Sequence, residues 1–235
     1  MSRQVSKTPA PITMKRLLLL LTVTLLFLGQ AGFAQVRMGV KAGLSFSNWD
    51  GQAVNSLEKL VSVTNGVAQT KMKTGFYAGA FADIPVGERF SIEPGLYYTQ
   101  KGYSLSGNLE IDKLNFLGAN VSAQVRSHYI DMPLLFKANV AKGLNIYAGP
   151  QVSYMVMNDL RLSAGILGIN FLHQSIPMTD LFKRWDAAIV GGVGYQFENG
   201  LSLNAGYDYG LTKIDKGSNF SSYNRVIRVG IGYRF

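Results

Sequence analysis

In several segments of the chain, apolar residues occupy every second position and charged residues lie among the positions between them, as in VRMGVKAGLSFS (36–47) and NRVIRVGIGYRF (224–235). Over all such segments the charges have both signs. Charges that gather on one face of a strand either pair with each other or line a path for ions or protons. The residues that we place on this face are Arg37, Lys41, Glu93, Lys101, Asp131, Lys137, Asp186, Asp208, Arg228 and Arg234.

Other site chemistry has little support in the sequence. The two histidines, His128 and His173, are far apart and lack a cysteine or carboxylate cluster at metal-ligand spacing. No GxSxG motif is present. A hydrolase would need a nucleophile, a base and an orienting acid that meet in space. We therefore expect no enzyme activity, no cofactor and no metal site.

The composition differs from that of a typical soluble domain and excludes several kinds of partner and site. Charged residues make up 16% of the 235 residues, against roughly 25% in typical soluble domains. The net charge of +9 falls to +5 when the four cations among the first 34 residues, which hold no acid, are subtracted. No Lys/Arg run remains, so we expect no nucleic-acid partner. The absence of cysteine excludes disulfides and thiolate metal sites.

The first 34 residues have the pattern of an export signal. Lys15 and Arg16 precede an apolar run over 17–28, and small residues follow near Ala34. This three-part pattern predicts a signal peptide over 1–34, with Met14 as the better start and a mature domain over 35–235. The alternative is a membrane anchor, but the run of 12 residues is short of the ~20 that a spanning helix needs.

Alternation with a period of two predicts eight strands in the mature chain. Each predicted strand has about 10–14 residues, whereas soluble strands usually have about 5–6. A tilted strand of about 9–11 residues crosses a bilayer. The predicted strands lie near 36–47, 72–83, 90–103, 129–139, 144–156, 185–197, 201–212 and 224–235.

The links between these strands alternate in length. Short, turn-like links are predicted at 84–89, 140–143 and 198–200. Longer links are predicted at 48–70, 104–124, 159–183 and 214–223. In an up-and-down barrel, alternate links lie at opposite ends. Outer-membrane barrels have short periplasmic turns at one end and long loops at the other.

The size of the side chains decides which face meets lipid. Eight strands enclose a narrow interior, which the large apolar and aromatic residues of one face would overfill. We therefore expect the apolar face to meet lipid, with the charges inside. A closed ring also pairs every backbone amide, as hydrocarbon demands. The sequence predicts an all-β, eight-stranded antiparallel up-and-down transmembrane β-barrel in the outer membrane, with both termini periplasmic.

The interior charges have two interpretations. They line a selective pore or an ion path, or they pair and plug the barrel. Because buried charges must be paired, a narrow polar lumen favours ion pairs. We predict a closed lumen with a charge network of Arg37, Lys41, Glu93, Asp131, Lys137, Asp186, Asp208, Arg228 and Arg234.

Two of the longer links have features of their own. The link at 159–183 is unusually apolar, and it could form an extended hairpin, cover the mouth of the barrel or meet a partner. The link at 48–70 contains VNSLEKLV, which is compatible with a short helix. The simplest interpretation of both segments is self-packing.

Several segments resemble one family. GVKAGLSFSNW, FYAGAFADIPVGERFSIEPGLYYTQKG, YIDMPLLFKANVAKGLNIYAGPQVSYMV and VGIGYRF resemble the PorT-like outer-membrane β-barrel family of Bacteroidota, over about 36–235. The resemblance implies that Tyr233 and Phe235 form the signal by which the barrel assembly machinery recognises its substrates. It also implies a link to a secretion system.

Two functional hypotheses follow. The first is a non-enzymatic outer-membrane barrel that acts through its extracellular loops or as an accessory to protein secretion. Its partners would be outer-membrane lipid, the barrel assembly machinery and a secretion-system component. The alternative is a small transport or ligand-binding barrel that passes solutes across the outer membrane.

Overall fold

The structure is a computed structural model that describes residues 36–51, 68–109, 119–166, 169–179, 182–216 and 221–235. The predicted signal peptide over 1–34, with its start at Met14, and the predicted short helix over 54–61 lie outside these residues. Residues 37–235 form one compact unit. Within the described ranges, no helix is long and apolar enough to cross a membrane.

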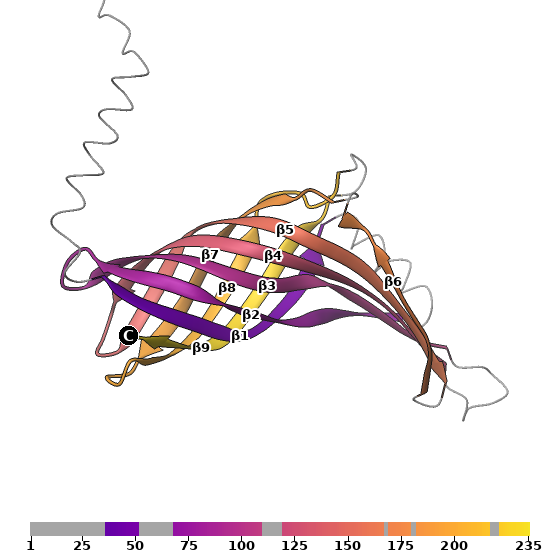
Figure 1. The fold of residues 1–235 in the computed structure, drawn as a ribbon, viewed down its shortest axis with the longest axis horizontal. Coiled ribbons are helices and arrows are strands. Elements are labelled where there is room, and N and C mark those ends of the chain that lie inside the picture. Colours follow the sequence, from indigo (N-terminus) through magenta and orange to yellow (C-terminus); the bar gives the residue numbers. More distant parts are fainter. Residues whose placement is uncertain (1–35, 52–67, 110–118, 167–168, 180–181, 217–220) are drawn as a thin grey trace, which may run out of the picture. The chain divides into compact units, whose positions relative to one another are not determined.

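Antiparallel strands make up nearly all of the described chain (Figure 1). The period-two pattern therefore gave the correct class of structure. The nine strands of the described residues are β1 (Arg37–Asp50), β2 (Ala68–Pro85), β3 (Phe90–Leu109), β4 (Ala119–Asn139), β5 (Leu144–Ile166), β6 (Ile169–Pro177), β7 (Trp185–Gln196), β8 (Leu201–Gly210) and β9 (Tyr223–Arg234).

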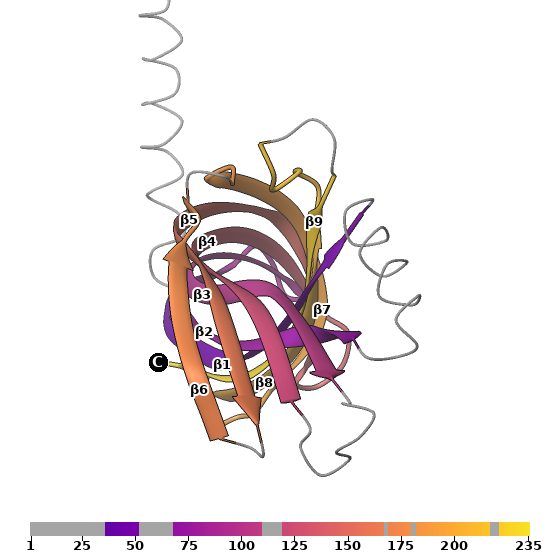
Figure 2. The same ribbon diagram turned by 90° about the vertical axis from the view of Figure 1, so that its right-hand side faces the viewer.

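Eight of these strands close a ring. From β1 to β4, each strand pairs with the next one in the chain, so that β4 pairs with β5. β5 then pairs with β7, β7 with β8, β8 with β9, and β9 with β1. The backbone N–H of Phe235 donates to the carbonyl of Met38 at 2.9 Å beside this last ladder. Figure 2 shows the strands curving around a common axis. The predicted eight-stranded barrel is confirmed.

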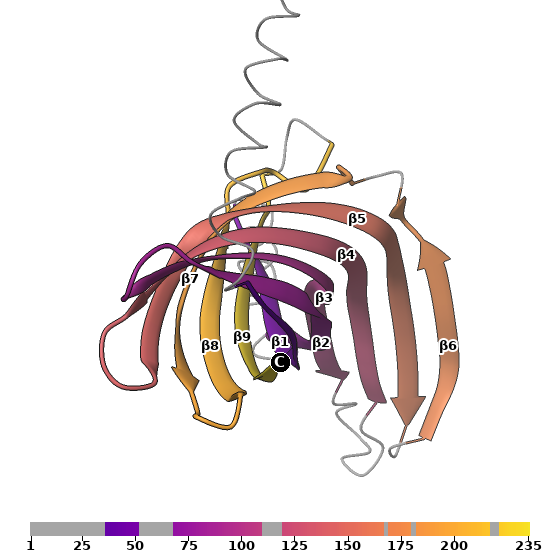
Figure 3. The same ribbon diagram turned by 60° about the vertical axis from the view of Figure 1, so that its left-hand side comes forward.

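The ninth strand, β6, lies outside the ring. It pairs with the far half of β5, where Asp159 faces Pro177 and Ile166 faces Ile169. Figure 3 shows β6 beside β5 at the edge of a sheet that continues beyond the ring. The predicted link at 159–183 is therefore mostly strand, and it forms the extended hairpin that was one of its three interpretations.

The short links lie where the sequence placed them. They cover 86–89, 140–143 and 197–200 between their strands. Neighbouring turns are joined by hydrogen bonds, since Asn139 donates to the carbonyl of Arg89 at 2.8 Å and Gln196 to that of Gly143 at 2.7 Å. We call this the turn end of the barrel and the opposite one the loop end.

Strands β2 to β5 are longer than predicted. They have 18, 20, 21 and 23 residues, so residues 104–109 and 119–124, predicted as part of a link, are strand instead. The expectation failed because the alternation weakens there: KGYSLSGNL in β3 has few apolar positions. Where lipid no longer covers one face, nothing selects an apolar side chain at every second position.

Burial separates the two faces of the ring in the predicted sense. Outward apolar side chains are half exposed, such as Leu44 at 50% and Ile231 at 56%, whereas inward polar ones, such as Glu93 at 1%, are buried. A soluble barrel would have the opposite arrangement. The outward aromatic residues, at 38–73% exposure, are Phe76, Phe90, Phe136, Trp185, Tyr195, Phe197, Tyr207, Tyr209, Tyr233 and Phe235.

Candidate functional site: the lumen of the barrel

The turn end of the lumen holds five ionisable side chains, which we call the turn-side ion group: Lys41, Asp83, Glu93, Lys137 and Arg234. Glu93 is paired with Lys41 through one oxygen and with Lys137 Nζ at 2.8 Å through the other. Asp83 accepts from Arg234 Nη1 at 3.1 Å and lies 3.8 Å from Lys137. Strands β1, β2, β3, β4 and β9 each supply one member, so the group joins five consecutive strands of the ring.

Next to this group, towards the loop end, three aromatic side chains from β2 and β3 are buried in the lumen. Tyr77, Phe81 and Tyr97, the lumen aromatic group, are 5%, 4% and 4% exposed. Tyr77 and Tyr97 meet edge to face with ring centroids 6.2 Å apart, a favourable aromatic geometry. Lys41 Nζ lies 4.4 Å from the Phe81 ring centroid, so this group rests directly on the turn-side ion group.

Glycines on the neighbouring strands make room for these rings. A Cβ atom at Gly43 would lie 2.9 Å from Tyr77 Cε1 and 2.2 Å from the Val229 carbonyl. A Cβ at Gly39 would lie 2.4 Å from Phe81 Cζ. Because both distances are far inside van der Waals contact, the rings can lie against the wall only where it lacks side chains.

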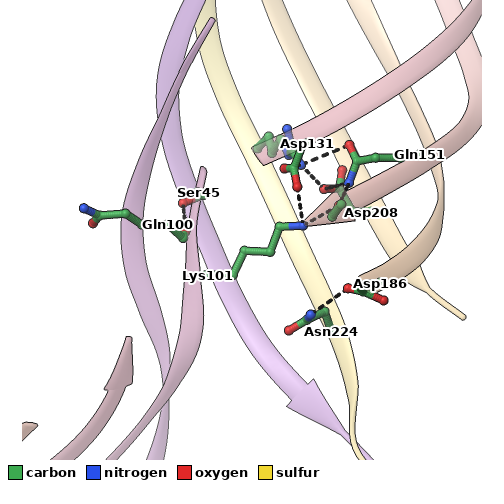
Figure 4. Close-up of polar contacts among 10 residues, drawn as sticks. Ser45, Gln100, Lys101, Asp131, Gln151, Asp186, Asp208 and Asn224 are labelled. Carbon is green, nitrogen blue, oxygen red and sulfur yellow. Dashed lines mark hydrogen bonds and ion pairs between the residues drawn. The ribbon is translucent and has the colours of Figure 1, made fainter. Parts of the chain in front are cut away.

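On the loop side of the aromatic group lies a second set of charges, the loop-side ion group: Lys101, Asp131, Asp208 and Arg228. Figure 4 shows Lys101, Asp131 and Asp208 close together. Asp131 accepts from Lys101 Nζ at 2.9 Å and from Arg228 Nη2 at 2.6 Å. Arg228 is also paired with Asp208. Two cations and two carboxylates balance, which low-dielectric burial requires.

Neutral side chains add hydrogen bonds to the loop-side ion group. Gln151 accepts from Arg228 Nη2 at 3.2 Å and donates to Asp208 Oδ2 at 3.4 Å. Asp186 lies nearby and accepts from Asn224 Nδ2 at 2.8 Å, as Figure 4 shows. Arg228 Cζ lies 5.5 Å from the Tyr77 ring centroid. The aromatic group is thus held between two ion groups.

The loop end of the lumen has an aromatic cap. Trp49 stacks on Tyr103 with ring centroids 5.5 Å apart and an interplanar angle of 13°, and Phe182 lies 5.6 Å from Trp49. Phe182 belongs to the link between β6 and β7, and it forms a β-bridge with Asp215 in the link between β8 and β9. Two links therefore meet over the mouth of the ring.

The predicted charge network divides into these groups, with two exceptions. Arg37 is exposed at the start of β1 and joins neither group. Asp186 lies inside but pairs with an amide. The residues that the structure places in the network are Lys41, Glu93, Asp131, Lys137, Asp208, Arg228 and Arg234.

Sequence reasoning missed part of the lumen. The prediction omitted Asp83, a member of the turn-side ion group, and Gln151, which bonds to two members of the loop-side ion group. The lumen aromatic group was also absent from it. Only their spacing in the sequence could have placed these residues in the lumen. Tyr77, Phe81 and Asp83 are separated by even numbers of residues, so they share one face of β2.

The predicted assembly signal lies on the outer surface. Tyr233 and Phe235 are 46% and 73% exposed, and their rings meet edge to face with centroids 5.6 Å apart. Both stand at the turn end. Across the described ranges, no three His, Cys, Asp or Glu side chains are grouped as metal ligands.

A closed antiparallel ring with an apolar outside and a charged inside defines a transmembrane β-barrel. The model of the outer membrane protein beta-barrel domain family matches residues 31–216, and the chain belongs to that family. It is an outer-membrane β-barrel protein. Its apolar outer face is in contact with outer-membrane lipid. No curated protein matches the chain.

Several solved structures are similar to the chain at low identity. Ail, the attachment invasion locus protein of Yersinia pestis, solved with the heparin analogue sucrose octasulfate, is 12% identical with a TM-score of 0.42, covering 85% of this chain and 99% of Ail. Neisserial surface protein A is 14% identical with a TM-score of 0.40, covering 84% and 97%. OprG of Pseudomonas aeruginosa is 12% identical with a TM-score of 0.40, covering 85% and 95%.

Proposed function

We propose that this chain is a non-enzymatic outer-membrane barrel with a closed lumen that acts through the segments at its loop end. In this proposal the turn end and both termini face the periplasm. The protein serves as an accessory to protein secretion, in keeping with its resemblance to PorT-like barrels. Tyr233 and Phe235 are its signal to the assembly machinery.

The filled lumen is the observation that supports closure. The lumen aromatic group lies between two ion groups whose members contact its rings, and Trp49 and Tyr103 stack beyond them. An ion that passed through would have to separate buried ion pairs and displace packed rings. Both changes cost several kcal/mol. A solute pathway, the alternative function, lacks comparable support.

Conductance tests the closed lumen. Purified full-length protein in a planar bilayer should give no stable channel steps, because the interior is packed. Tyr77→Ala combined with Tyr97→Ala removes two rings from the lumen and should produce measurable leak. Phe136→Ala removes an aromatic ring from the outward face and is the matched control. Stable unitary steps from the unaltered protein would instead support the transport alternative.

Crosslinking in native membranes tests the accessory role. Among the described residues, the β5–β6 hairpin is the largest element beyond the ring. Exchanging residues 160–176 for a short turn removes the β5–β6 ladder and the outermost β4–β5 pairs, but it keeps the β4–β5 pairs from Arg126 to Asn139 and the whole β5–β7 ladder. We expect a component of an export machine to crosslink to the unaltered protein and to be lost in this variant. Recovery of the barrel alone from both preparations would contradict the accessory role and leave closure to the conductance test.

A further inference from the structure

The strand β6 leaves one of its two backbone edges open. Beyond the ring, β3 to β6 continue as what we call the extended sheet, residues 103–109, 119–125, 160–166 and 169–177. Within the described chain, β6 is the last strand of this sheet and pairs with β5 alone (Figure 3). Its sequence, INFLHQSIP, contains no Lys, Arg, Asp or Glu, side chains that commonly keep edges from pairing. An open edge of this kind is a template for a further strand.

The register with β5 shows which backbone groups of β6 face the open side. The N–H of Met178 donates to the carbonyl of Asn158 at 2.9 Å, directly after Pro177. Because the hydrogen-bonded positions of an antiparallel pair alternate, Pro177 and Ser175 direct their backbone groups away from β5. Proline has no N–H, and it fits at 177 because the missing donor would face the open side. Ser175 therefore offers both an N–H donor and a C=O acceptor at this edge.

The two faces of the sheet exchange their character beyond the ring. Within the ring, β5 places Gln151 and Ser153 in the lumen and Val152, at 45% exposure, on the outside. In the extended sheet the apolar side chains lie on the inner face instead, since Val125 is two positions from buried Ser127 on β4. The inner face has two rows of directly paired residues: Tyr103, Val125, Leu160 and Ile176, and then Leu105, Ala123, Leu162 and Gln174.

The row that begins at Tyr103 ends at the open edge. Ile176, its last member, is 39% exposed, and no further strand of the described chain covers it. A strand added beside β6 would place every second side chain next to this row, on the same face of the sheet. Apolar side chains at those positions would bury the exposed part of Ile176, so the inner face favours an added strand that is apolar at alternate positions.

The outer face near this edge has an excess of positive charge among its described side chains. Arg161 Nε is paired with Asp159 Oδ2 at 2.7 Å, yet the arginine side chain remains 47% exposed. Arg126, opposite Asp159 on β4, has no carboxylate ion partner within the described chain. Ser175 is the residue of β6 opposite Arg161. Because serine is small, Arg161 can extend past it toward an added strand, which would lie about 10 Å from β5.

We propose that the open edge of β6 binds an extended segment of a partner protein in which apolar residues alternate with acidic ones. The segment adds a strand through the backbone groups of Ser175 and Pro177. Its apolar side chains continue the row that ends at Ile176, and its acidic side chains face Arg161. Main-chain hydrogen bonds give such strand addition its affinity, and alternate side chains give it specificity. The inference rests on the proposed action through the loop end, and it defines the chemistry of the partner.

Peptide binding to the folded full-length protein in detergent tests this proposal. The probes are a short fluorescent peptide in which valine alternates with glutamate, the same peptide with lysine in place of glutamate, and the glutamate peptide with every amide nitrogen methylated. Fluorescence anisotropy measures their affinities. The glutamate peptide should bind about tenfold more tightly than either of the others, because one lacks the charge and the other the backbone donors. Amide hydrogen exchange at Ser175 should slow when it binds.

Two pairs of variants separate the backbone contribution from the charge. Ser175→Pro removes the N–H at the open edge and the side-chain bond to Asp159, whereas Ser175→Ala removes only that side-chain bond. We expect Ser175→Pro to bind the glutamate peptide about tenfold more weakly than Ser175→Ala. Arg161→Gln should reduce the preference for glutamate over lysine about tenfold. Lys142→Gln, a cation with 89% side-chain exposure at the turn end, is its matched control.

Folding and self-association are measured on the same samples. Both Ser175 variants should unfold in urea like the unaltered protein, because Ser175 belongs to no ladder of the ring. Equal affinity of the three peptides, or of the two Ser175 variants, would overturn the proposal. A dimer of the unaltered protein that Ser175→Pro dissociates would also overturn it, since the edge would then hold a second copy of this chain. Native crosslinks without an export component would contradict only the accessory role, so the two failures are distinguishable.

Discussion

Arg228 on β9 donates to Asp131 on β4 at 2.6 Å across the lumen, although 97 residues separate them in the sequence. The bond crosses the ring, because β9 and β4 are separated by β1, β2 and β3 on one side and by β8, β7 and β5 on the other. Asp131 is fully buried and accepts from Lys101 as well. The pairing therefore braces opposite walls of the barrel, and a change at this residue should act on the whole ring.

Asp131→Asn should destabilise the barrel strongly. It removes the carboxylate that is paired with buried Lys101 and leaves Arg228 with Asp208 as its one carboxylate partner. Breaking a buried ion pair costs about 3–5 kcal/mol. Urea unfolding of the barrel in lipid vesicles measures the loss. Glu198→Gln, which breaks an ion pair with 84% of the glutamate side chain exposed, should have no measurable effect. Equal stability of the two variants would show that the loop-side ion group does not brace the ring.

Gly43→Ala should destabilise the barrel because the added methyl group meets Tyr77 and the Val229 carbonyl. Overpacking of this kind costs about 1–3 kcal/mol. Gly191→Ala is the control, because the nearest atom to its Cβ is the Tyr147 carbonyl oxygen at 3.9 Å. The same urea titration compares the two variants. A Gly43→Ala barrel as stable as Gly191→Ala would contradict the close packing of Tyr77 against the wall.

Val229→Lys should reveal which face meets lipid. Val229 is half exposed near the middle of β9, and a lysine at the bilayer midplane costs about 2–4 kcal/mol. Met38→Lys, at the turn end of β1, should cost about 0–1 kcal/mol because the interface tolerates charge. Unfolding free energies in lipid vesicles test this difference. A Val229→Lys variant no less stable than Met38→Lys would argue against lipid on this face.

Phe235→Ala should impair assembly in cells but not folding in vitro. The ring is 73% exposed, and the backbone bond to Met38 does not need it. The fraction of heat-modifiable barrel in outer membranes should fall, while refolding into detergent proceeds normally. Phe90→Ala alters another exposed aromatic at the turn end and should assemble like the unaltered chain. If both variants assemble equally well, Phe235 is not a recognition signal.

The sequence predicted the ring well because lipid and lumen act on opposite faces of each strand. In β9 the apolar residues Ile227, Val229 and Ile231 alternate with Arg228, so no other period fits. The turns could also be predicted from the sequence. Gly143 and Gly200 have φ angles of 77° and 89°, which glycine adopts without strain, and both fall in predicted short links.

Packing inside the ring could not be predicted in the same way. Alternation predicts which residues share a face. It does not predict whether a given tyrosine faces lipid or the lumen, because tyrosine is compatible with both. Tyr77 and Tyr97 therefore blurred the pattern of β2 and β3, and Asp83 went unnoticed beside Phe81. The choice of partners, such as Arg228 with Asp131, depends on how far neighbouring strands are staggered when the ring closes.

The ladder between β1 and β9 has a consequence for the order of folding. It pairs Gly39 with Arg234, two residues at nearly opposite ends of the described chain. Because closing so long a loop costs the most conformational entropy, we expect this ladder to form last. Until residues 223–234 arrive, β1 presents an open edge of unpaired backbone groups, which invites pairing with other chains. A chain truncated before residue 223 would therefore remain an open sheet that is prone to aggregate through its unpaired edge. The incomplete barrel has to be protected from such pairing until β9 is in place.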